Sequence, residues 1–325
     1  MSPQAPSPAW SLSRFDPHDT GGFYESYFQR ANHPSRPLAF WIRYTLFMPR
    51  GRLAAAVGEL WAIFFDGETG VSTVAYERHP VAECAFSRTA FDVRVAAATL
   101  RYGELQGAAT QAGHKLAWSL CYDAGAAPLL LLPQGAYDAA FPKAKSVVVS
   151  PNCEYRGHLE VDGTRVEIAG WRGSQNHNWG VRHTDHYAWG QVAGFDDAPD
   201  AFLECMTARV RVGPVWSPWC TLLVLRALGQ QYSLNSIVRA PLARAHFEHF
   251  DWRFDAQLRG TRIEGRIHAP QSAFVRLTYQ NPKGGEKICW NSKLASAELT
   301  LTRPGERPVH LRTARRAAFE ILEDP

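Results

Sequence analysis

The side chains best able to do chemistry are concentrated in residues 174–191. This segment reads Ser-Gln-Asn-His-Asn-Trp-Gly-Val-Arg-His-Thr-Asp-His-Tyr-Ala-Trp-Gly-Gln, with three histidines, two tryptophans, an aspartate and a tyrosine. Core strands are normally built from branched and aromatic apolar residues, so this density of hydrogen-bonding groups is unusual for a strand. Polar groups that become buried must find partners. The composition therefore predicts either a pocket that binds a ligand or a satisfied polar network.

An extended chain from His183 onward would place alternate side chains on one face. The groups on that face would be a proton donor or acceptor, a carboxylate, a phenol, a flat apolar wall and an amide. They belong to His183, Asp185, Tyr187, Trp189 and Gln191. An aromatic lining with a few placed polar groups is typical of small-molecule sites. The alternative is a structural network at a barrel corner, with Trp179 as a plug beneath it.

Short strand-like runs separated by turn residues fill most of the chain. Examples are residues 40–47, 60–65, 91–95, 115–122 and 129–132. The runs at 159–161 and 166–168 are joined by Asp162-Gly163-Thr164, a strong β-hairpin signal. Aromatic residues make up 12% of the sequence, and helical periodicity is weak. Strands at regular spacing with turn signals indicate an all-β sandwich or barrel fold.

A repeated pattern indicates two similar units. Residues 98–107 align without gaps to residues 256–265, where alanine, Leu-Arg and a final glycine coincide. Together with a length of 325 residues, this predicts two antiparallel β-barrels in tandem. We expect a partly disordered N-terminal arm over 1–34, a first barrel over 35–172 and a second over 173–325. The polar segment then begins the second barrel, at a domain junction, where ligand sites are common.

Composition argues against several classes of partner and location. The net charge is +4, but 35 basic residues are dispersed among 31 acidic ones, so nucleic-acid binding is not expected. The six cysteines are far apart and include no Cys-x-x-Cys pair, which favours reduced, mostly buried thiols. Residues 1–20 lack the apolar core of a secretory signal, and the longest apolar runs are too short to span a bilayer. We therefore expect a soluble, cytoplasmic protein.

The motif Asn176-His177-Asn178-Trp179-Gly180, followed by Trp189-x-Gln191, carries a family resemblance. It resembles the signature of a two-barrel lipocalin-like superfamily that includes carotenoid 1,2-hydratases (hydroxyneurosporene synthases), tocopherol cyclases and fungal decalin-forming Diels–Alder cyclases. The resemblance implies two calycin-type barrels that enclose an isoprenoid or polyketide-type substrate without a metal or redox cofactor. It implies cofactor-independent hydration, cyclisation or isomerisation of an olefin. The alternative is a carrier that binds such a molecule without changing it.

One position departs from the family pattern. The hydratases resemble one another in having aspartate where this chain has Asn176, and an amide cannot be the proton source that an alkene needs. Another carboxyl must then be the acid. Asp185 is the first candidate, Glu204 the second and Glu154 the third. Burial would favour the neutral, proton-donating form of such a group.

The hypothesis divides the polar side chains into catalytic and substrate-binding groups. We expect the catalytic groups to be Asp185, His177, His183, Tyr187 and Glu204. We expect the substrate-binding groups to be Asn176, Asn178, Trp179, Trp189 and Gln191. A metal site built from His177, His183, Asp185 and His186 is an alternative, but its spacing is not diagnostic, and we predict no metal and no cofactor. The expected partner is a hydrophobic small molecule, with transient membrane association as a means of access.

Overall fold

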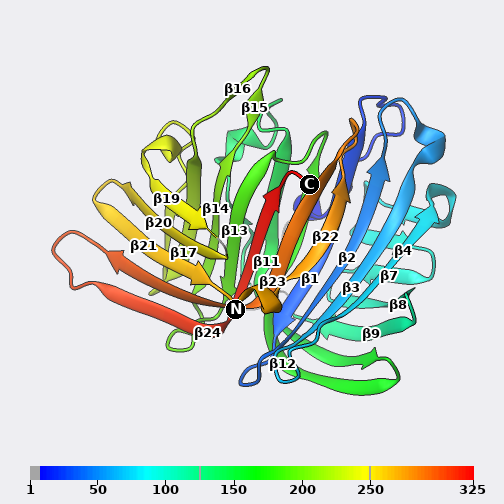
Figure 1. Ribbon diagram of the computed structural model, residues 1–325, viewed down its shortest axis with the longest axis horizontal. Helices are drawn as coiled ribbons and strands as arrows, with labels where there is room; N and C mark the ends of the chain where they lie inside the picture. Colours follow the sequence, from blue (N-terminus) through cyan, green and yellow to red (C-terminus); the bar gives the residue numbers. More distant parts are fainter. Residues whose placement is uncertain (1–7, 124–125, 249) are drawn as a thin grey trace. The chain divides into compact units, whose positions relative to one another are not determined.

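The computed structural model describes residues 8–123, 126–248 and 250–325. Regular structure in these residues is β-strand with short 3-10 turns (Figure 1). The chain forms two compact units. Unit 1 contains the described residues up to 129 together with 143–183 and 280–285, and unit 2 contains 130–142, 184–279 and 286–325. Residues 280–285 thus belong to unit 1 although the residues on both sides of them belong to unit 2. Residues 130–142 belong to unit 2 although the residues on both sides of them belong to unit 1.

Unit 1 is built on an antiparallel sheet of 12 strands in the described residues. The strand order is β4-β3-β2-β1-β12-β11-β9-β8-β7-β6-β5, with β10 paired to β11. The bounds are β1 Phe23–Asn32, β2 Leu38–Met48, β3 Val57–Asp66, β4 Thr73–Pro80, β5 Cys84–Phe86, β6 Asp92–Val95, β7 Ala98–Arg101, β8 Glu104–Gln111, β9 His114–Tyr122, β10 Leu129–Leu130, β11 Ala144–Val161 and β12 Thr164–Gly180.

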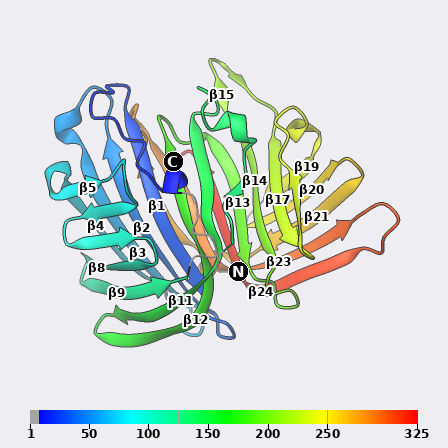
Figure 2. The same cartoon turned by 180° about the vertical axis from the view of Figure 1, so that it is seen from behind.

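Unit 2 is built on an antiparallel sheet of 10 strands in the described residues, seen from behind in Figure 2. Its order is β18-β17-β14-β13-β24-β23-β21-β20-β19, with β22 paired to β23. The bounds are β13 His186–Ala193, β14 Phe202–Arg209, β17 Cys220–Ala227, β18 Gln230–Leu234, β19 Arg244–Glu248, β20 Asp251–Leu258, β21 Thr261–His268, β22 Val275–Gln280, β23 Glu286–Thr302 and β24 Val309–Glu323. A separate hairpin joins β15 Arg211–Val212 to β16 Val215–Trp216. The 3-10 turns are η1 Pro8–Trp10, η2 Leu53–Ala55, η3 Val81–Glu83, η4 Gln134–Ala136, η5 Ala240–Leu242 and η6 Gln271–Ala273.

In each unit the first long strand pairs with the last one. β1 pairs with β12 in unit 1, and β13 pairs with β24 in unit 2. Beyond the first strand of the seam the neighbours are β2-β3-β4 in unit 1 and β14-β17-β18 in unit 2, and beyond the last strand they are β11-β9-β8-β7 and β23-β21-β20-β19. This common arrangement confirms the prediction of two lipocalin-like antiparallel barrels in tandem.

Alternate residues of the strands fill the barrel interiors. Strand β9 shows the pattern directly, because Leu116, Trp118 and Leu120 are buried while their neighbours are more exposed. The same alternation places Leu203 and Cys205 of β14 in the core of unit 2. Removing this apolar surface from water is the main stabilising term, at about 25 cal/mol per Å². These apolar side chains form the core of each barrel.

Strands β1 and β2 are buried at every residue, on both faces of the sheet. Two-sided burial removes the alternation of polar and apolar residues by which a strand is normally recognised. Polar side chains on such strands must be satisfied inside the protein. The groups that form the candidate site come from this doubly buried region.

The structure revises the expected domain boundaries. The sequence predicts an arm over residues 1–34, but β1 lies inside the sheet between β2 and β12. Residues 1–7, where disorder was expected, lie outside the described residues. The expected boundary at 172 falls within β12, which continues to Gly180. A strand such as Phe23–Asn32 was not recognised because its burial on both faces hides the period of two.

The predicted hairpin at Asp162-Gly163 is confirmed. Val161 pairs with Thr164, and the two turn residues have φ of 49° and 80°, as a type I′ turn requires.

The repeated sequence pattern is shifted by one strand relative to the architecture. It aligns the β7–β8 hairpin with β20–β21, whereas the strand order makes β8–β9 the counterpart of β20–β21.

Candidate functional site

A ladder of polar side chains lines the inner faces of β1 and β12 in unit 1. Antiparallel pairing sets Glu25 opposite Trp179, Tyr27 opposite His177 and Gln29 opposite Gln175. Alternate residues share a face, and Tyr27 and Ala31 belong to the barrel core. All three cross-strand pairs therefore face inward. We call these six residues the polar ladder.

A fully buried pair, Glu25 and His177, lies at one end of the polar ladder. Nε2 of His177 is 2.9 Å from Oε1 of Glu25, and neither side chain has exposed surface. Ser13 Oγ donates to Oε2 of Glu25 at 2.6 Å, and the Arg14 backbone N–H donates to Oε1 at 2.7 Å. Nδ1 of His177 is 2.7 Å from the carbonyl oxygen of Trp10. The segment 10–14 thus covers the pair.

These partners determine where the protons of His177 lie. A carbonyl oxygen only accepts, so Nδ1 must donate to Trp10. The contact between Nε2 and Glu25 then contains one further proton. Ser13 and Arg14 also donate to the two oxygens of this carboxyl group. One proton is therefore shared between Nε2 of His177 and Glu25, and Nδ1 carries another.

Aromatic rings surround the Glu25–His177 pair. The Tyr27 ring stacks on His177 with centroids 4.2 Å apart and planes 8° apart, and the Trp179 ring lies 4.7 Å from His177. The π-faces of such rings stabilise positive charge. Burial, and then the neighbouring Glu25, raise the pKa of Tyr27 well above its ordinary value, so the phenol stays neutral.

Gln29 and Gln175 continue the polar ladder into the barrel. Oε1 of Gln29 accepts a hydrogen bond from the Tyr155 hydroxyl. Nε2 of Gln29 and Nε2 of Gln175 are buried and have no hydrogen-bond partner among the described residues. Buried amide donors of this kind are normally satisfied by water or by a ligand. They can hold an oxygen atom of a bound molecule close to the acid–base pair.

Gly180 permits the strand pairing that positions Trp179 and His177. A Cβ atom at this position would lie 2.3 Å from the carbonyl oxygen of Lys143. The next backbone N–H, of Val181, donates to that same oxygen at 3.2 Å. A side chain here would push β11 away from β12. The glycine of the motif is thus explained by the close approach of two backbones.

A second polar cluster lies on β13 and β14 of unit 2. Nε1 of Trp189 and Nε2 of Gln191 donate to the two oxygens of Glu204 at 2.8 Å and 2.9 Å. Glu204 is 1% exposed. Ala188 and Val192 belong to the core of this barrel, so alternation directs Trp189 and Gln191 to the opposite face of the sheet.

A buried lysine extends the unit 2 cluster. Nζ of Lys293 is 2.8 Å from Oε1 of Glu320, bonds to Oδ1 of Asn291 and lies 5.6 Å from the centre of the Trp189 ring. Asn291 also donates to Glu320 at 3.0 Å, and the Tyr187 hydroxyl lies 3.5 Å from the other oxygen of Glu320. Each buried charge therefore has opposite charge or donors beside it, as a satisfied network requires.

No protein-family model matches the chain. An uncharacterised protein of Mycobacterium tuberculosis, in strains CDC 1551 and H37Rv, is 25% identical over 251 residues, covering 74% of this chain and 70% of that protein. A crystal structure of a candidate AttH protein from Nitrosomonas europaea has a TM-score of 0.59 at 12% identity, covering 98% of this chain and 99% of that one. Kievitone hydratase from Nectria haematococca has a TM-score of 0.57 at 11% identity, covering 99% and 94%. CghA, also solved with Sch210972, has a TM-score of 0.53 at 12% identity, covering 94% and 89%.

The fold is that of these two-barrel proteins. The likeness extends over nearly the whole chain, so it covers both barrels and not one of them alone. It confirms, at the level of fold, the resemblance to the lipocalin-like hydratase and cyclase superfamily. At such low identities it does not transfer a substrate or a site residue.

The single polar face expected from His183 to Gln191 is not formed. The chain bends at residues 181–182 and again at 185, and β13 begins only at His186, so Tyr187, Trp189 and Gln191 alone share a face. The His183 ring stacks on Tyr24 at 4.0 Å, within unit 1. The physical reason is that the chain passes from unit 1 to unit 2 between residues 183 and 184.

Asp185 makes contacts that organise the start of β13. It is 4% exposed, and its Oδ2 accepts a hydrogen bond from the Arg211 backbone N–H at 2.8 Å. Its carbonyl oxygen accepts from Nζ of Lys287 at 2.7 Å. The structure therefore distributes the expected catalytic groups over two clusters: His177 lies in unit 1, and Asp185, Tyr187 and Glu204 lie in unit 2.

The two asparagines of the motif lie on the face of β12 opposite the polar ladder. Nδ2 of Asn176 donates to Ser174 Oγ at 2.9 Å, and the side chain is buried. Oδ1 of Asn178 is buried and has no hydrogen-bond partner among the described residues. The departure from aspartate at position 176 therefore does not remove an acid from the interior of this barrel.

Sequence reasoning missed the residues that complete both clusters. In unit 1 these are Ser13, Glu25, Gln29 and Gln175, and in unit 2 they are Asn291, Lys293 and Glu320. The available signal was a charged residue within an otherwise aromatic or aliphatic run. Glu25 lies in Phe23-Tyr-Glu-Ser-Tyr-Phe28, and Lys293 lies in a strand that continues to Thr302.

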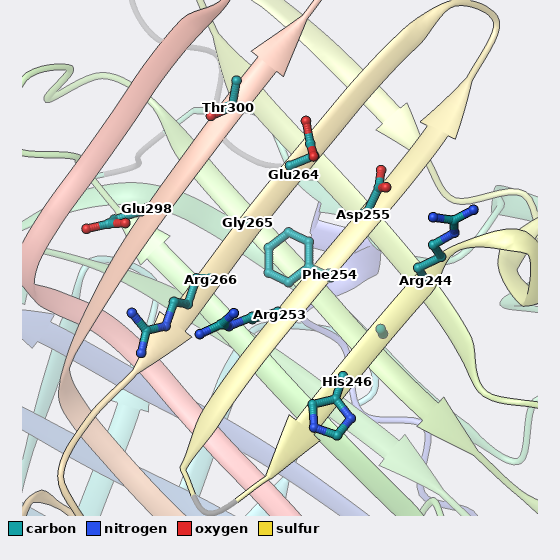
Figure 3. Close-up of a pocket in the computed structure, with 11 residues that line it drawn as sticks. Arg244, His246, Arg253, Phe254, Asp255, Glu264, Gly265, Arg266, Glu298 and Thr300 are labelled. Carbon is teal, nitrogen blue, oxygen red and sulfur yellow. The ribbon is translucent and has the colours of Figure 1, made fainter.

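Other regions offer weaker candidates. Within the described residues, no group of three or more His, Cys, Asp or Glu side chains is arranged to hold a metal ion, and no helix is long and apolar enough to cross a membrane. A surface groove of about 620 Å³ lies on β19, β20, β21 and β23, with Phe254 at its floor (Figure 3). Its charges are of both signs, and Arg266 is paired with Asp251. Such a groove is typical of a solvated sheet face.

Proposed function

We propose that this protein is an enzyme that binds a hydrophobic isoprenoid or polyketide-type molecule and catalyses cofactor-independent hydration, cyclisation or isomerisation of an olefin. The observation that carries the proposal is the Glu25–His177 pair, which has no exposed surface and lies beside the amide donors of Gln29 and Gln175. Buried acid–base groups that lie among aromatic rings and polar donors are candidates for catalysis. The shared fold with kievitone hydratase supports the reaction class.

In this proposal His177 is the proton-transfer group. Once the Trp10 carbonyl moves away, the electron pair of the double bond takes the proton from Nδ1, which forms a C–H bond and leaves the second carbon electron-deficient. Water, or a nucleophilic group of the same molecule, adds to that carbon and releases a proton, which returns to Nδ1. Loss of a proton from a neighbouring carbon instead would give isomerisation. Glu25 holds the imidazole in orientation, and the rings of Tyr27 and Trp179 stabilise the developing charge.

The acid strength of the pair restricts the substrate. An imidazolium is too weak an acid to protonate an isolated alkene, so the olefin must be polarised, for example by conjugation to a carbonyl group. The free amide N–H groups of Gln29 and Gln175 would bind that oxygen and assist the polarisation. This favours the polyketide-type member of the substrate class.

Access to the pair requires the segment 10–14 to move. Trp10, Ser13 and Arg14 all hydrogen-bond to Glu25 or His177, and they cover the end of the polar ladder. A segment that opens for the substrate and then closes would exclude water from the reactive cation.

We retain Asp185, His183, Tyr187 and Glu204 as proposed alternatives for the acid or donor. The unit 2 residues Trp189 and Gln191 are proposed to contribute through Glu204.

The test is native extraction and mass analysis of the small molecule that co-purifies with the wild-type chain and with Glu25→Gln, His177→Gln and Asp185→Asn. We expect product with the wild type and with Asp185→Asn, and unconverted precursor with the first two variants. Precursor accumulating only with Asp185→Asn would move the acid to unit 2. The same unchanged molecule in all four samples would show a carrier, and an empty protein in all four would contradict ligand binding.

A further inference from the structure

An amphipathic basic surface lies at one edge of unit 2, far in sequence from the polar ladder. The loop between β18 and β19 exposes Ile237, Val238 and Leu242, at 39%, 88% and 75%. Large aliphatic side chains are rarely this exposed without a partner, and a group of them on one loop marks an interaction surface. The loop is well ordered, since Ala240 is buried and the backbone N–H groups of Arg239 and Ala240 both donate to the Ser236 carbonyl.

Arginines border this loop. A groove of about 840 Å³ beside it is lined by Arg239, Leu242, Arg244, Asp255, Gln257, Leu258, Arg259, Gly260 and Arg262. Four arginines thus meet a single carboxylate, and Asp255 is already engaged by both nitrogens of Arg262 at 2.9 Å and 2.8 Å. Figure 3 shows Asp255 near Arg244, its neighbour across the β19–β20 pair.

Arg239, Arg244 and Arg259 form no ion pair with any residue that the structure describes. Arg259 also occupies a turn position with a φ of 50°, where glycine or asparagine is normally preferred. The groove therefore presents uncompensated positive charge beside exposed aliphatic groups.

We infer that this surface, Ile237 to Leu242 with Arg239, Arg244 and Arg259, docks on a membrane rich in anionic lipids. Guanidinium groups pair with lipid phosphates while aliphatic side chains enter the boundary between headgroups and acyl chains. A free phosphate would use the arginines but would leave Val238 and Leu242 in water. The inference is independent of the reaction proposed above, and it gives a protein with an apolar ligand a route to that ligand.

Cosedimentation with phosphatidylcholine vesicles, with and without phosphatidylglycerol, tests the inference. We expect binding only to the anionic vesicles, and loss of that binding at high salt, which screens exposed charges. The triple variant Arg239→Gln, Arg244→Gln, Arg259→Gln should bind about 100-fold more weakly, at roughly fivefold for each charge. The double variant Val238→Ser, Leu242→Ser should bind roughly tenfold more weakly.

Matched controls distinguish this surface from general stickiness. Val212→Ser with Val215→Ser removes two aliphatic groups that are each 65% exposed on the β15–β16 hairpin, and it should bind like the wild type. Arg36→Gln with Arg165→Gln removes two exposed arginines that already have carboxylate partners, with the same expectation. Equal loss in the controls, equal binding to neutral vesicles, or competition by inorganic phosphate with no effect of the aliphatic variant would each overturn the inference.

Discussion

The two barrels share a strand order but differ in what their interiors contain. Inside the unit 1 barrel (barrel 1), strands β1 and β12 carry an ionisable pair, Glu25 and His177. The amides of Gln29 and Gln175 lie on the same two strands. Inside the unit 2 barrel (barrel 2), two buried threonines and a core tryptophan form a neutral hydrogen-bonded group. Thr207 and Thr221 share a hydrogen bond of 2.9 Å, and Nε1 of Trp252 donates to Thr207 at 3.1 Å.

This difference distinguishes buried polar groups that satisfy a hydrogen-bond donor of the core from buried polar groups that can transfer a proton. The threonine pair of barrel 2 satisfies the indole N–H of a core tryptophan, which is all that packing requires. The Glu25–His177 pair of barrel 1 instead buries two ionisable groups, which is costly unless they are paired, and its other partners come from the covering segment 10–14. The charges of unit 2 are instead on the face opposite its core, where Glu204 and Glu320 each have N–H donors. Barrel 1 is therefore the place where chemistry is expected.

The largest expected effect comes from breaking the ionic pair. Glu25→Leu leaves the buried His177 ring, the Ser13 hydroxyl and the Arg14 backbone N–H without their common partner, which should lower the free energy of unfolding by about 3–5 kcal/mol. Thr207→Val in barrel 2 removes two neutral hydrogen bonds, with Thr221 and Trp252, and should cost about 2 kcal/mol. Urea unfolding of both variants measures the difference. Adding His177→Leu to Glu25→Leu should restore part of the loss, and equal losses for the two single variants would show that the barrel 1 pair is not charged.

The next largest effect concerns the glycine that follows a tryptophan in each unit. A Cβ at Gly180 meets the backbone oxygen of Lys143 at 2.3 Å, whereas at Gly190 it meets the Cδ1 end of Ile267 at the same distance. A backbone cannot move aside as a side-chain end can, so Gly180→Ala should cost about 3 kcal/mol and Gly190→Ala about 1 kcal/mol. Thermal unfolding of the two variants gives the order, and the reverse order would contradict the close strand approach in unit 1.

A smaller effect is expected where the N-terminal segment covers the pair. Ser13→Ala removes a hydrogen bond to the Glu25 carboxylate and should cost about 1.5–2 kcal/mol. It should also speed proteolysis within residues 10–14, because the segment opens more often. Barrel 2 has no comparable contact to a buried carboxylate from a terminal segment in the described residues, so Ser217→Ala is a suitable control. Unchanged proteolysis in Ser13→Ala would show that the segment is held by other contacts.

The smallest effect is a pH dependence in unit 2. Hydrogen bonds from Lys287 and then His186 lower the pKa of Asp324 from 3.8 to about 2. Because the pKa is lower in the folded protein, this group stabilises the fold above its ordinary pKa, and the contribution is lost as the pH falls through about 2. Its carboxylate is largely exposed and screened, so the contribution is under about 1 kcal/mol. Asp324→Asn should flatten the acid limb of the unfolding curve slightly, and an unchanged limb would contradict the assignment.

The fold was predictable because most strands alternate. Runs such as 115–122 show a period of two, and the turn Asp162-Gly163 needs no tertiary information. The sequence repeat correctly predicted two similar units, although the hairpins that it aligns do not occupy equivalent places in the two sheets. Strand β1 was not predictable, because a strand buried on both faces has no polar face by which to be recognised.

The candidate site was predictable only in part. His177 and Trp179 were identified from the motif, and the structure places both on the inner face of β12. Glu25 was not identified from the sequence, because its contact with His177 joins residues 152 positions apart in the sequence. The shared face expected for Asp185 was not formed, for the opposite reason. Adjacency in sequence suggested a shared face, and the crossing of the chain between units removed it.

The composition of the two units has a consequence for how the protein can be divided. Residues 280–285 complete unit 1, where Pro282 accepts a hydrogen bond from Arg50 and Asn281 accepts one from His183, while residues 130–142 belong to unit 2. Each half of the gene product therefore lacks a piece of its own barrel. The chain crosses between the units at 129/130, 142/143, 183/184, 279/280 and 285/286, so cleavage at 183/184 alone would not yield two self-sufficient domains.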